Sequence, residues 1–246
     1  MNRAIGLLAL VSAAFGAGDP PIPERERAAM LAQFAAEVTA LDKAIEENPR
    51  DPGNFSRRGD RFLFLGNFAA AVADFERMIA LDPAQDAPHW RLGIAYHFAH
   101  QFAKSARQFE KYHAYDGVDR ENGIWKFLAD VKVFGLEPAR RAMLAYHRFD
   151  REPFPSLYEM FAGRKSTEQF LADLKARGHD TNARVMFFAN YYAGLNEELA
   201  GRRDAALALV REAVANSWGR TAEGGPTYMW QVARLHYEVM TAPLRR

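Results

Sequence analysis

Three histidines come closest, in type and spacing, to a chemical site. His97 and His100 are three residues apart, and His89 precedes His100 by eleven, so on a helix they would lie near one stripe. Zinc sites draw His, Cys, Asp or Glu ligands from more than one element. The chain has no cysteine and no H-E-x-x-H motif. We therefore predict no metal site and no cofactor.

Signatures of catalysis are also missing from the sequence. There is no G-x-S-x-G motif, no P-loop and no G-x-G-x-x-G turn. The paired carboxylates Glu46–Glu47 and Glu197–Glu198 are adjacent on predicted helices, so their side chains point in different directions. The glycine-rich stretch 219–226 lacks a phosphate-binding motif and is expected to be a connector or a loop that contacts a partner. We predict that the protein is not an enzyme.

A 34-residue period in the middle of the chain predicts the elements that would position a binding site. Gly59 recurs as Gly93, and Phe75 recurs as Phe109. From Phe55 the first copy reads F-x-x-R-G-x-x-F, then A-x-x-x-F, then P. This order resembles the tetratricopeptide repeat, a pair of antiparallel helices that binds other proteins. The resemblance implies an all-α solenoid of helical hairpins with N-terminal and C-terminal capping helices.

The same resemblance indicates which residues would line a binding groove. In this family the first helix of each repeat faces the concave side of the solenoid. The candidate groove residues are then Asp60, Phe64, Trp90, Ile94, His97, Phe98, Lys126 and Asp130. Such a groove suits an extended peptide or a partner helix. Trp90 is the expected anchor and His97 would contact a partner carboxylate; the alternative is that Trp90 packs under a neighbouring helix.

Composition limits the class of partner. The 246 residues are 49% hydrophobic, which is sufficient for one sizeable core. Lys and Arg total 32 against 31 for Asp and Glu, which gives a formal net charge of +1. A balanced charge gives no reason to expect a nucleic acid partner.

The N-terminus is expected to be an export signal. Arg3 precedes an apolar stretch of 14 residues, Ala4 to Ala17, which is shorter than the roughly 20 residues that span a bilayer. The alternative is an apolar helix that docks on the domain. Without cysteine there are no disulfides and no thiol to lipidate, so we expect no membrane anchor. The mature protein should be soluble, and periplasmic or secreted.

The chain divides into five predicted segments. They are a signal peptide at 1–18, a linker and N-terminal helix at 19–51, two clear repeats at 52–119, a degenerate hairpin with short helices at 120–180, and a C-terminal repeat-like hairpin with a final helix at 181–246. The degenerate hairpin should run from Trp125, with its second helix at Ala142–Tyr146. Capping boxes at Ser156 and Ser166 should open short helices, and the final helix should span about 227–240.

This order of segments is similar to the NlpI family of bacterial envelope lipoproteins. The stretches that carry the resemblance are Trp125–Ala129, Ser166–Lys175, Asn190–Leu195 and Ala213–Asn216. It implies a dimeric, non-enzymatic adaptor that docks envelope proteases and peptidoglycan hydrolases, although the lipid-bearing cysteine of that family is missing here. We therefore expect an exported adaptor. The alternatives are a periplasmic small-ligand or carbohydrate-binding module, and a structural, self-assembling protein.

Overall fold

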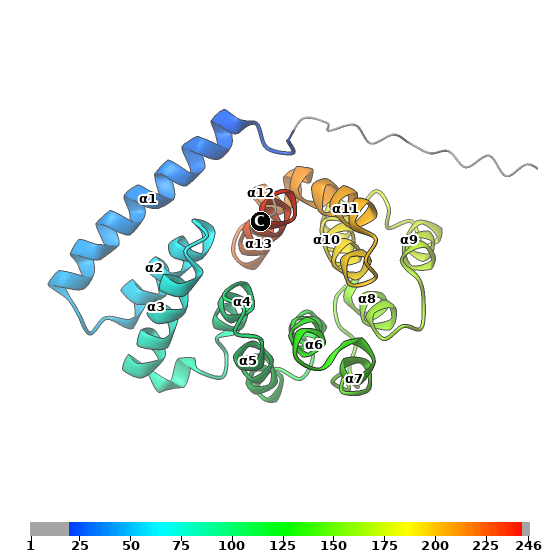
Figure 1. Ribbon diagram of the computed structural model, residues 1–246, viewed down its shortest axis with the longest axis horizontal. Helices are drawn as coiled ribbons and strands as arrows, with labels where there is room; N and C mark the ends of the chain where they lie inside the picture. The colour runs from blue at the N-terminus through cyan, green and yellow to red at the C-terminus, as the bar shows by residue number, and fades with distance from the viewer. Residues whose placement is uncertain (1–19, 243–246) are drawn as a thin grey trace, which may run out of the picture.

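The computed structural model describes residues 20–242, and this part of the chain is all-α. It contains thirteen α-helices, one short 3₁₀ helix and no strand. Figure 1 shows the helices α1 to α11 following one another around an arc, with α13 inside it. The expected all-α class is confirmed.

The elements follow in chain order. They are α1 Glu24–Glu47, α2 Pro52–Phe64, α3 Phe68–Leu81, η1 Pro83–Gln85, α4 Trp90–Phe98, α5 Phe102–Tyr115, α6 Arg120–Phe134, α7 Leu136–Arg141, α8 Phe154–Phe161, α9 Thr167–Ala176, α10 Ala183–Leu199, α11 Arg203–Ala215, α12 Ser217–Thr221 and α13 Gly225–Thr241.

Three pairs of consecutive helices pack through the same kind of contact. A glycine on the first helix lies so close to a side chain on the second that an added Cβ would come within 2.6–2.7 Å of it. The pairs are Gly59 with Phe75, Gly93 with Phe109, and Gly194 with Val210. Phe75 and Phe109 are fully buried, which agrees with their place at the aromatic position of the 34-residue pattern. Only glycine allows the helix axes to approach this closely.

Local signals set the ends of the first hairpin. The Asp51 carboxylate accepts a hydrogen bond from the backbone N–H of Gly53 (2.8 Å), and Pro52 is the first residue of α2. Gly66 has a φ of 79° in the turn before α3. This is the left-handed conformation that glycine adopts readily.

The predicted second helix at Ala142–Tyr146 is wrong. Helix α7 ends at Arg141, and residues 142–150 have no regular secondary structure; we call them the irregular segment. Tyr146 nevertheless packs on α6: a Cβ at Gly123 would lie 2.4 Å from its phenolic oxygen. The Tyr146 hydroxyl also donates to the backbone carbonyl of Asp119 (3.1 Å). These contacts bring the irregular segment back to the start of α6.

Two further local predictions have different outcomes. Ser156 lies inside α8, which already begins at Phe154, so the predicted capping box there is wrong. The box at Ser166 is confirmed, because its hydroxyl accepts from the N–H of Gln169 (3.2 Å) and the Gln169 side chain accepts from the N–H of Ser166 (2.8 Å). The stretch 219–226 is not entirely loop, since it includes the end of α12 and the start of α13.

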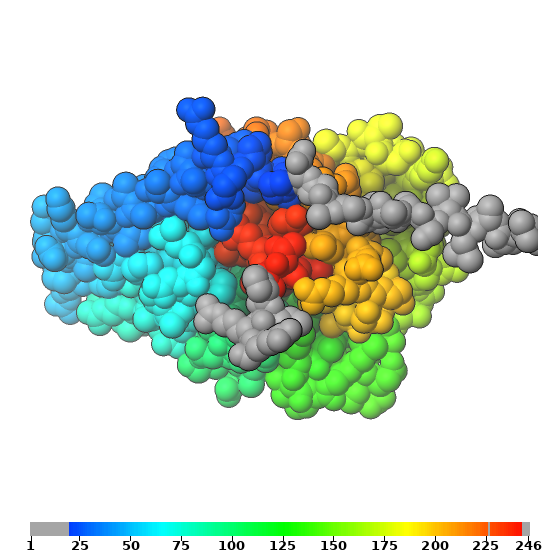
Figure 2. Space-filling model, turned by 45° about the horizontal axis from the view of Figure 1, so that its top comes forward, coloured from blue at the N-terminus to red at the C-terminus, as the bar shows by residue number. Residues whose placement is uncertain are grey.

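Helix α13 completes the core from inside the arc. The Arg234 guanidinium is 1% exposed and donates to the backbone carbonyl of Phe64 (2.5 Å) and to Glu238 (2.8 Å). Arg27 of α1 donates to the same Glu238 carboxylate (2.7 Å). Figure 2 shows the exposed part of α13, in red, between α1, the α2–α3 hairpin and α11. The last described helix is therefore bonded to both the first helix and the first hairpin.

The expected signal segment, residues 1–18, lies outside the described residues. Among residues 20–242, no helix has both the length and the apolar character needed to cross a bilayer.

Candidate functional site

The apolar candidates for the groove lie beneath α13. Phe64, Ile94 and Phe98 are at most 6% exposed. The ring of Phe64 lies 4.9 Å from that of Tyr228, and the ring of Phe98 lies 4.7 Å from that of His236. The expectation of an open groove is corrected here, because the chain's own helix covers this face.

The charged candidates are already paired within the chain. Asp60 accepts from Arg91 (2.5 Å), and Asp130 accepts from Lys126 (2.7 Å). Burial raises the pKa of Asp60 to about 6, although the nearby Arg91 opposes the shift. Asp60 Oδ1 has no hydrogen-bond partner among residues 20–242, but Asp60 and Asp130 are at most 9% exposed, so neither carboxylate is open to a partner.

His97 lies in a different cavity from Trp90. It shares a space of about 300 Å³ with His236 and Lys132, and its ring lies 5.3 Å from that of Trp125. Burial lowers the pKa of His97 to about 3, and the charge of Lys132 adds to this. The imidazole is therefore neutral near pH 7 and does not attract a carboxylate by charge. In the described part of the chain, no group of three His, Cys, Asp or Glu residues is placed to hold a metal ion.

Of the eight groove candidates, only Trp90 lines the principal cavity. This cavity has a volume of about 360 Å³ and lies between α4, α6, α10, α12 and the first turns of α13. Trp125 and Trp218 line it as well, so three of the four tryptophans of the chain meet there. An aromatic-lined cavity of this size is typical of a binding site.

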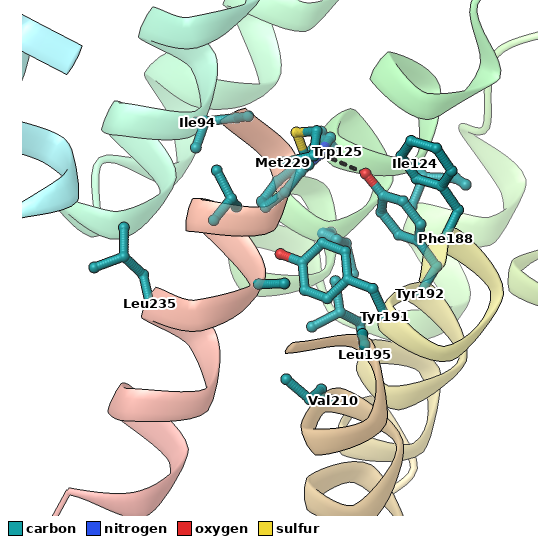
Figure 3. Packing of buried hydrophobic residues seen from close by; sticks show 14 of the residues in the cluster. Ile94, Ile124, Trp125, Phe188, Tyr191, Tyr192, Leu195, Val210, Met229 and Leu235 are labelled. Atoms are coloured by element: carbon teal, nitrogen blue, oxygen red, sulfur yellow. Dashed lines mark hydrogen bonds between the residues drawn. The ribbon is translucent and has the colours of Figure 1, made fainter. Parts of the chain in front are cut away.

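The cavity wall is built from side chains of separate helices. Figure 3 shows Trp125 of α6 beside Met229 of α13, with Phe188 and Tyr192 of α10 close by. The ring of Phe188 lies 6.1 Å from that of Trp218. Helices distant in sequence therefore have to pack together before the wall exists.

A buried carboxylate stands at the base of the aromatic wall. Glu121 accepts a hydrogen bond from the Tyr192 hydroxyl (2.6 Å) and another from Arg151 (2.5 Å). The Tyr192 hydroxyl in turn accepts from the Trp125 indole N–H (3.0 Å). Burial raises the pKa of Glu121 to about 7, although Arg151 opposes the shift. This chain of hydrogen bonds fixes the orientation of Trp125.

Arg151 pairs with two further carboxylates, that of Asp119 at the start of α6 and that of its neighbour Asp150. Its guanidinium lies 3.4 Å from Asp119 and 3.2 Å from Asp150, and stacks 4.3 Å from the centre of the Phe154 ring. The second oxygen of Asp150 accepts from the backbone N–H of Arg120, at the start of α6 (2.8 Å). These contacts hold the Arg151 guanidinium at the cavity.

Asn216 positions the opposite rim. Its side-chain oxygen accepts from the backbone N–H of Trp218 (3.0 Å), and its amide donates to the backbone carbonyl of Ala183 (2.9 Å). Trp218 and Arg184 are thereby brought to the same side of the cavity, which both line. Arg184 is exposed and has no hydrogen bond or ion pair among residues 20–242.

One feature of the sequence, the placement of its tryptophans, indicates this site independently of the repeat pattern. Tryptophan is scarce in the chain, yet Trp90, Trp125 and Trp218 all contribute to one cavity. The charged partners Glu121 and Arg151 carried no motif. They pair only because the irregular segment comes back to the start of α6.

No protein-family model matches the sequence, and no curated protein is similar to it at a significant level.

Proposed function

We propose that the chain is a tetratricopeptide-like adaptor that binds a segment of another protein, and that the principal cavity receives an anchor side chain of that segment. The observation that carries the proposal is the convergence of Trp90, Trp125 and Trp218 on one cavity. Large aromatic residues dominate binding energy where proteins meet. Helix α13 covers Phe64, Ile94 and Phe98, whereas this cavity remains accessible beside its first turns.

The repeat assignment is supported by the three glycine contacts. In each hairpin the packed side chain follows its glycine at the same spacing, although Val210 replaces the aromatic residue in the last one. Small residues at that point are what the repeat requires of its two helices. This supports a solenoid interrupted between residues 120 and 180.

Export is part of the proposal, on the strength of Arg3 and the apolar stretch after it. The partners would then be envelope proteins, with proteases and peptidoglycan hydrolases as the classes that the family resemblance implies. Intact mass of the protein from its native host should show a start between Phe15 and Asp19. Recovery of the chain from Met1 in the cytoplasm would refute export.

Self-association is proposed through α1, the longest helix. Its stripe of apolar residues is only partly used inside the chain: Phe34 is buried and lies 5.5 Å from the Phe64 ring, whereas Leu41 and Ile45 are partly exposed. Light scattering should report a dimer. A mass that stays monomeric at high concentration contradicts this proposal.

A periplasmic small-ligand or carbohydrate-binding module is the second candidate. The cavity favours it because its volume of about 360 Å³ lies in the range of small-molecule sites, roughly 300–1,000 Å³. An aromatic wall with a few fixed polar groups also fits a sugar ring. The two candidates differ in whether a protein segment binds at all.

Capture from envelope extract tests the adaptor. Trp218→Ala should weaken partner capture at least tenfold, about 1.4 kcal/mol. Helical circular dichroism should remain unchanged because Trp218 is only partly buried on a short helix. Phe149→Ala is the control, since Phe149 is 74% exposed and is not one of the residues that line the cavity. Equal capture by both variants would exclude the cavity as the adaptor site.

A further inference from the structure

The polar groups that remain free at the cavity are mainly donors. The two fully buried tryptophans have bonded N–H groups: Trp125 donates to Tyr192, and Trp230 donates to the backbone carbonyl of Val214 (2.9 Å). Trp90 and Trp218 are only partly buried, and their indole N–H groups have no acceptor among residues 20–242. A tryptophan N–H can act only as a donor.

Arg184 adds an unpaired positive charge to the same rim. Its guanidinium offers five N–H donors, and no carboxylate of the described residues lies within ion-pair distance. The first turn of α13 also borders the cavity at Gly225 and has no side-chain cap, so partial positive charge adds to that of Arg184. The free charge at this rim is positive.

The carboxylates of the cavity are already engaged. Glu121 is bonded to Tyr192 and Arg151, and Asp119 is bonded to Arg151 and to the Asn122 side chain (2.7 Å). A cationic ligand would have to compete with Arg151 for these oxygens and would also face Arg184. The cavity therefore disfavours a cation, despite its acidic residues.

We propose that the cavity binds an apolar group that carries a carboxylate, with the aromatic wall receiving the apolar part and Arg184 the carboxylate. In the adaptor on which this inference rests, the ligand is the C-terminal residue of a partner protein, with an aromatic or large aliphatic side chain. A guanidinium and a carboxylate form charge-assisted hydrogen bonds, and the indole N–H groups of Trp90 and Trp218 supply further donors. The volume of about 360 Å³ suits one large residue rather than a folded segment.

The first arm of the test uses a small probe and the intact protein. N-acetyl-phenylalanine and its C-terminal amide are titrated while tryptophan fluorescence is followed, because three of the four tryptophans line the cavity. The acid should bind at least tenfold more tightly than the amide. Arg184→Gln should abolish that preference without affecting folding, because the side chain is exposed. Arg141→Gln, at another exposed arginine, should retain it.

The second arm separates the two sources of such a ligand. A peptide that ends in a free phenylalanine carboxylate is compared with the same peptide after C-terminal amidation. Preference for the free end supports recognition of a protein C-terminus. Binding of N-acetyl-phenylalanine but of neither peptide retains the ligand chemistry and removes the adaptor role from this cavity.

Other outcomes overturn the inference. If the amidated peptide binds as tightly as the free one, the carboxylate is not recognised, although the adaptor proposal stands. If phenethylamine or an uncharged sugar binds more tightly than N-acetyl-phenylalanine, the assignment of ligand charge is wrong. If none of the probes changes the fluorescence or displaces another, the cavity does not recognise this class of ligand.

Discussion

The regular hairpins and the irregular segment after α6 use the same contact in different ways. In α2–α3 a glycine on one helix packs against Phe75 on the next helix. Gly123 of α6 packs just as closely against Tyr146, which lies in the irregular segment after α7. One glycine–aromatic contact is thus retained while the element that supplies the aromatic ring changes.

The two regions differ in how their polar groups are paired. The regular hairpins bury their polar groups in local pairs, such as Arg58 with Asp74 (2.8 Å). The irregular segment instead returns to the start of α6, where Asp150 accepts from the backbone N–H of Arg120 and Arg151 pairs with Glu121. The regular hairpins form the packed helical scaffold, and the irregular segment leads to Arg151, which supplies a charged group to the cavity.

The largest expected effect compares the two aromatic rings. Phe75→Ala should lower the free energy of unfolding by about 3–5 kcal/mol, because the ring is fully buried. Tyr146→Ala should cost less, about 2 kcal/mol, because that ring is partly exposed. Urea unfolding measures both values. A cost below about 1 kcal/mol for Phe75→Ala would mean that the regular hairpin does not depend on this contact.

The next effect concerns the ion pair that the irregular segment delivers. Arg151→Met keeps much of the aliphatic stem but leaves the Glu121 carboxylate buried without its positive partner. The free energy of unfolding, measured with urea, should fall by about 1.5–3 kcal/mol, as for hydrogen bonds to charged groups. Arg177→Met is the control, because Arg177 makes its ion pair with Glu152 at a more exposed position. Equal losses at both positions would show that burial of the pair has no influence.

The pH dependence of stability sharpens the same contrast. Glu121 has a folded-state pKa raised to about 7 from 4.5, mainly by burial. The folded state therefore holds this proton more tightly than the unfolded chain. The protonated Glu121 side chain contributes fully to the free energy of unfolding below about pH 4.5. This contribution is lost as the pH rises to about 7, at up to about 1.4 kcal/mol per pH unit.

Glu121→Gln removes this contribution. The difference in unfolding free energy between wild type and variant should change between pH 4.5 and pH 7 and be constant above that range. Asp60 has a raised pKa as well but remains in both proteins, so its contribution cancels. A constant difference across the range would show that Glu121 titrates normally.

The smallest effect compares two turns. Gly66 has a φ of 79° in the regular hairpin, and Gly135 has φ 86° with ψ 169° between α6 and α7. The second combination is essentially limited to glycine, whereas the left-handed helical region tolerates other residues at a cost. Gly66→Ala should cost about 1 kcal/mol, and Gly135→Ala should cost more, about 2 kcal/mol. Thermal unfolding should rank the two variants in that order.

The repeat pattern predicted the frame and not the site, for physical reasons. Glycine and aromatic residues at a fixed spacing act within one hairpin, so burial of Phe75 and Phe109 could be predicted from sequence. The irregular path of the chain at Tyr146 could not be predicted, because an aromatic ring can pack on Gly123 from a helix or from irregular chain. The convergence of Trp125 with Trp218 depends on α6, α10 and α12 packing together.

The position of α13 was the other feature that the sequence did not predict. From the sequence, an apolar helix after the last hairpin is expected to cap the end of a solenoid. The buried guanidinium of Arg234, bonded to the carbonyl of Phe64, instead fixes it within the arc. That bond joins residues 170 positions apart, which a local pattern does not encode.

This placement has a consequence for how the protein is made. Helix α13 is synthesised after every other helix described here, yet it covers a face formed by the first hairpins. Chains emerge from the ribosome at about 5–20 residues per second. Throughout that time Phe64, Ile94 and Phe98 lack the cover that they have in the finished protein. The hairpins can form early because their contacts are local, but the apolar face is covered only after α13 has been synthesised. Until α13 packs against them, these apolar side chains are a surface through which the nascent chain can aggregate.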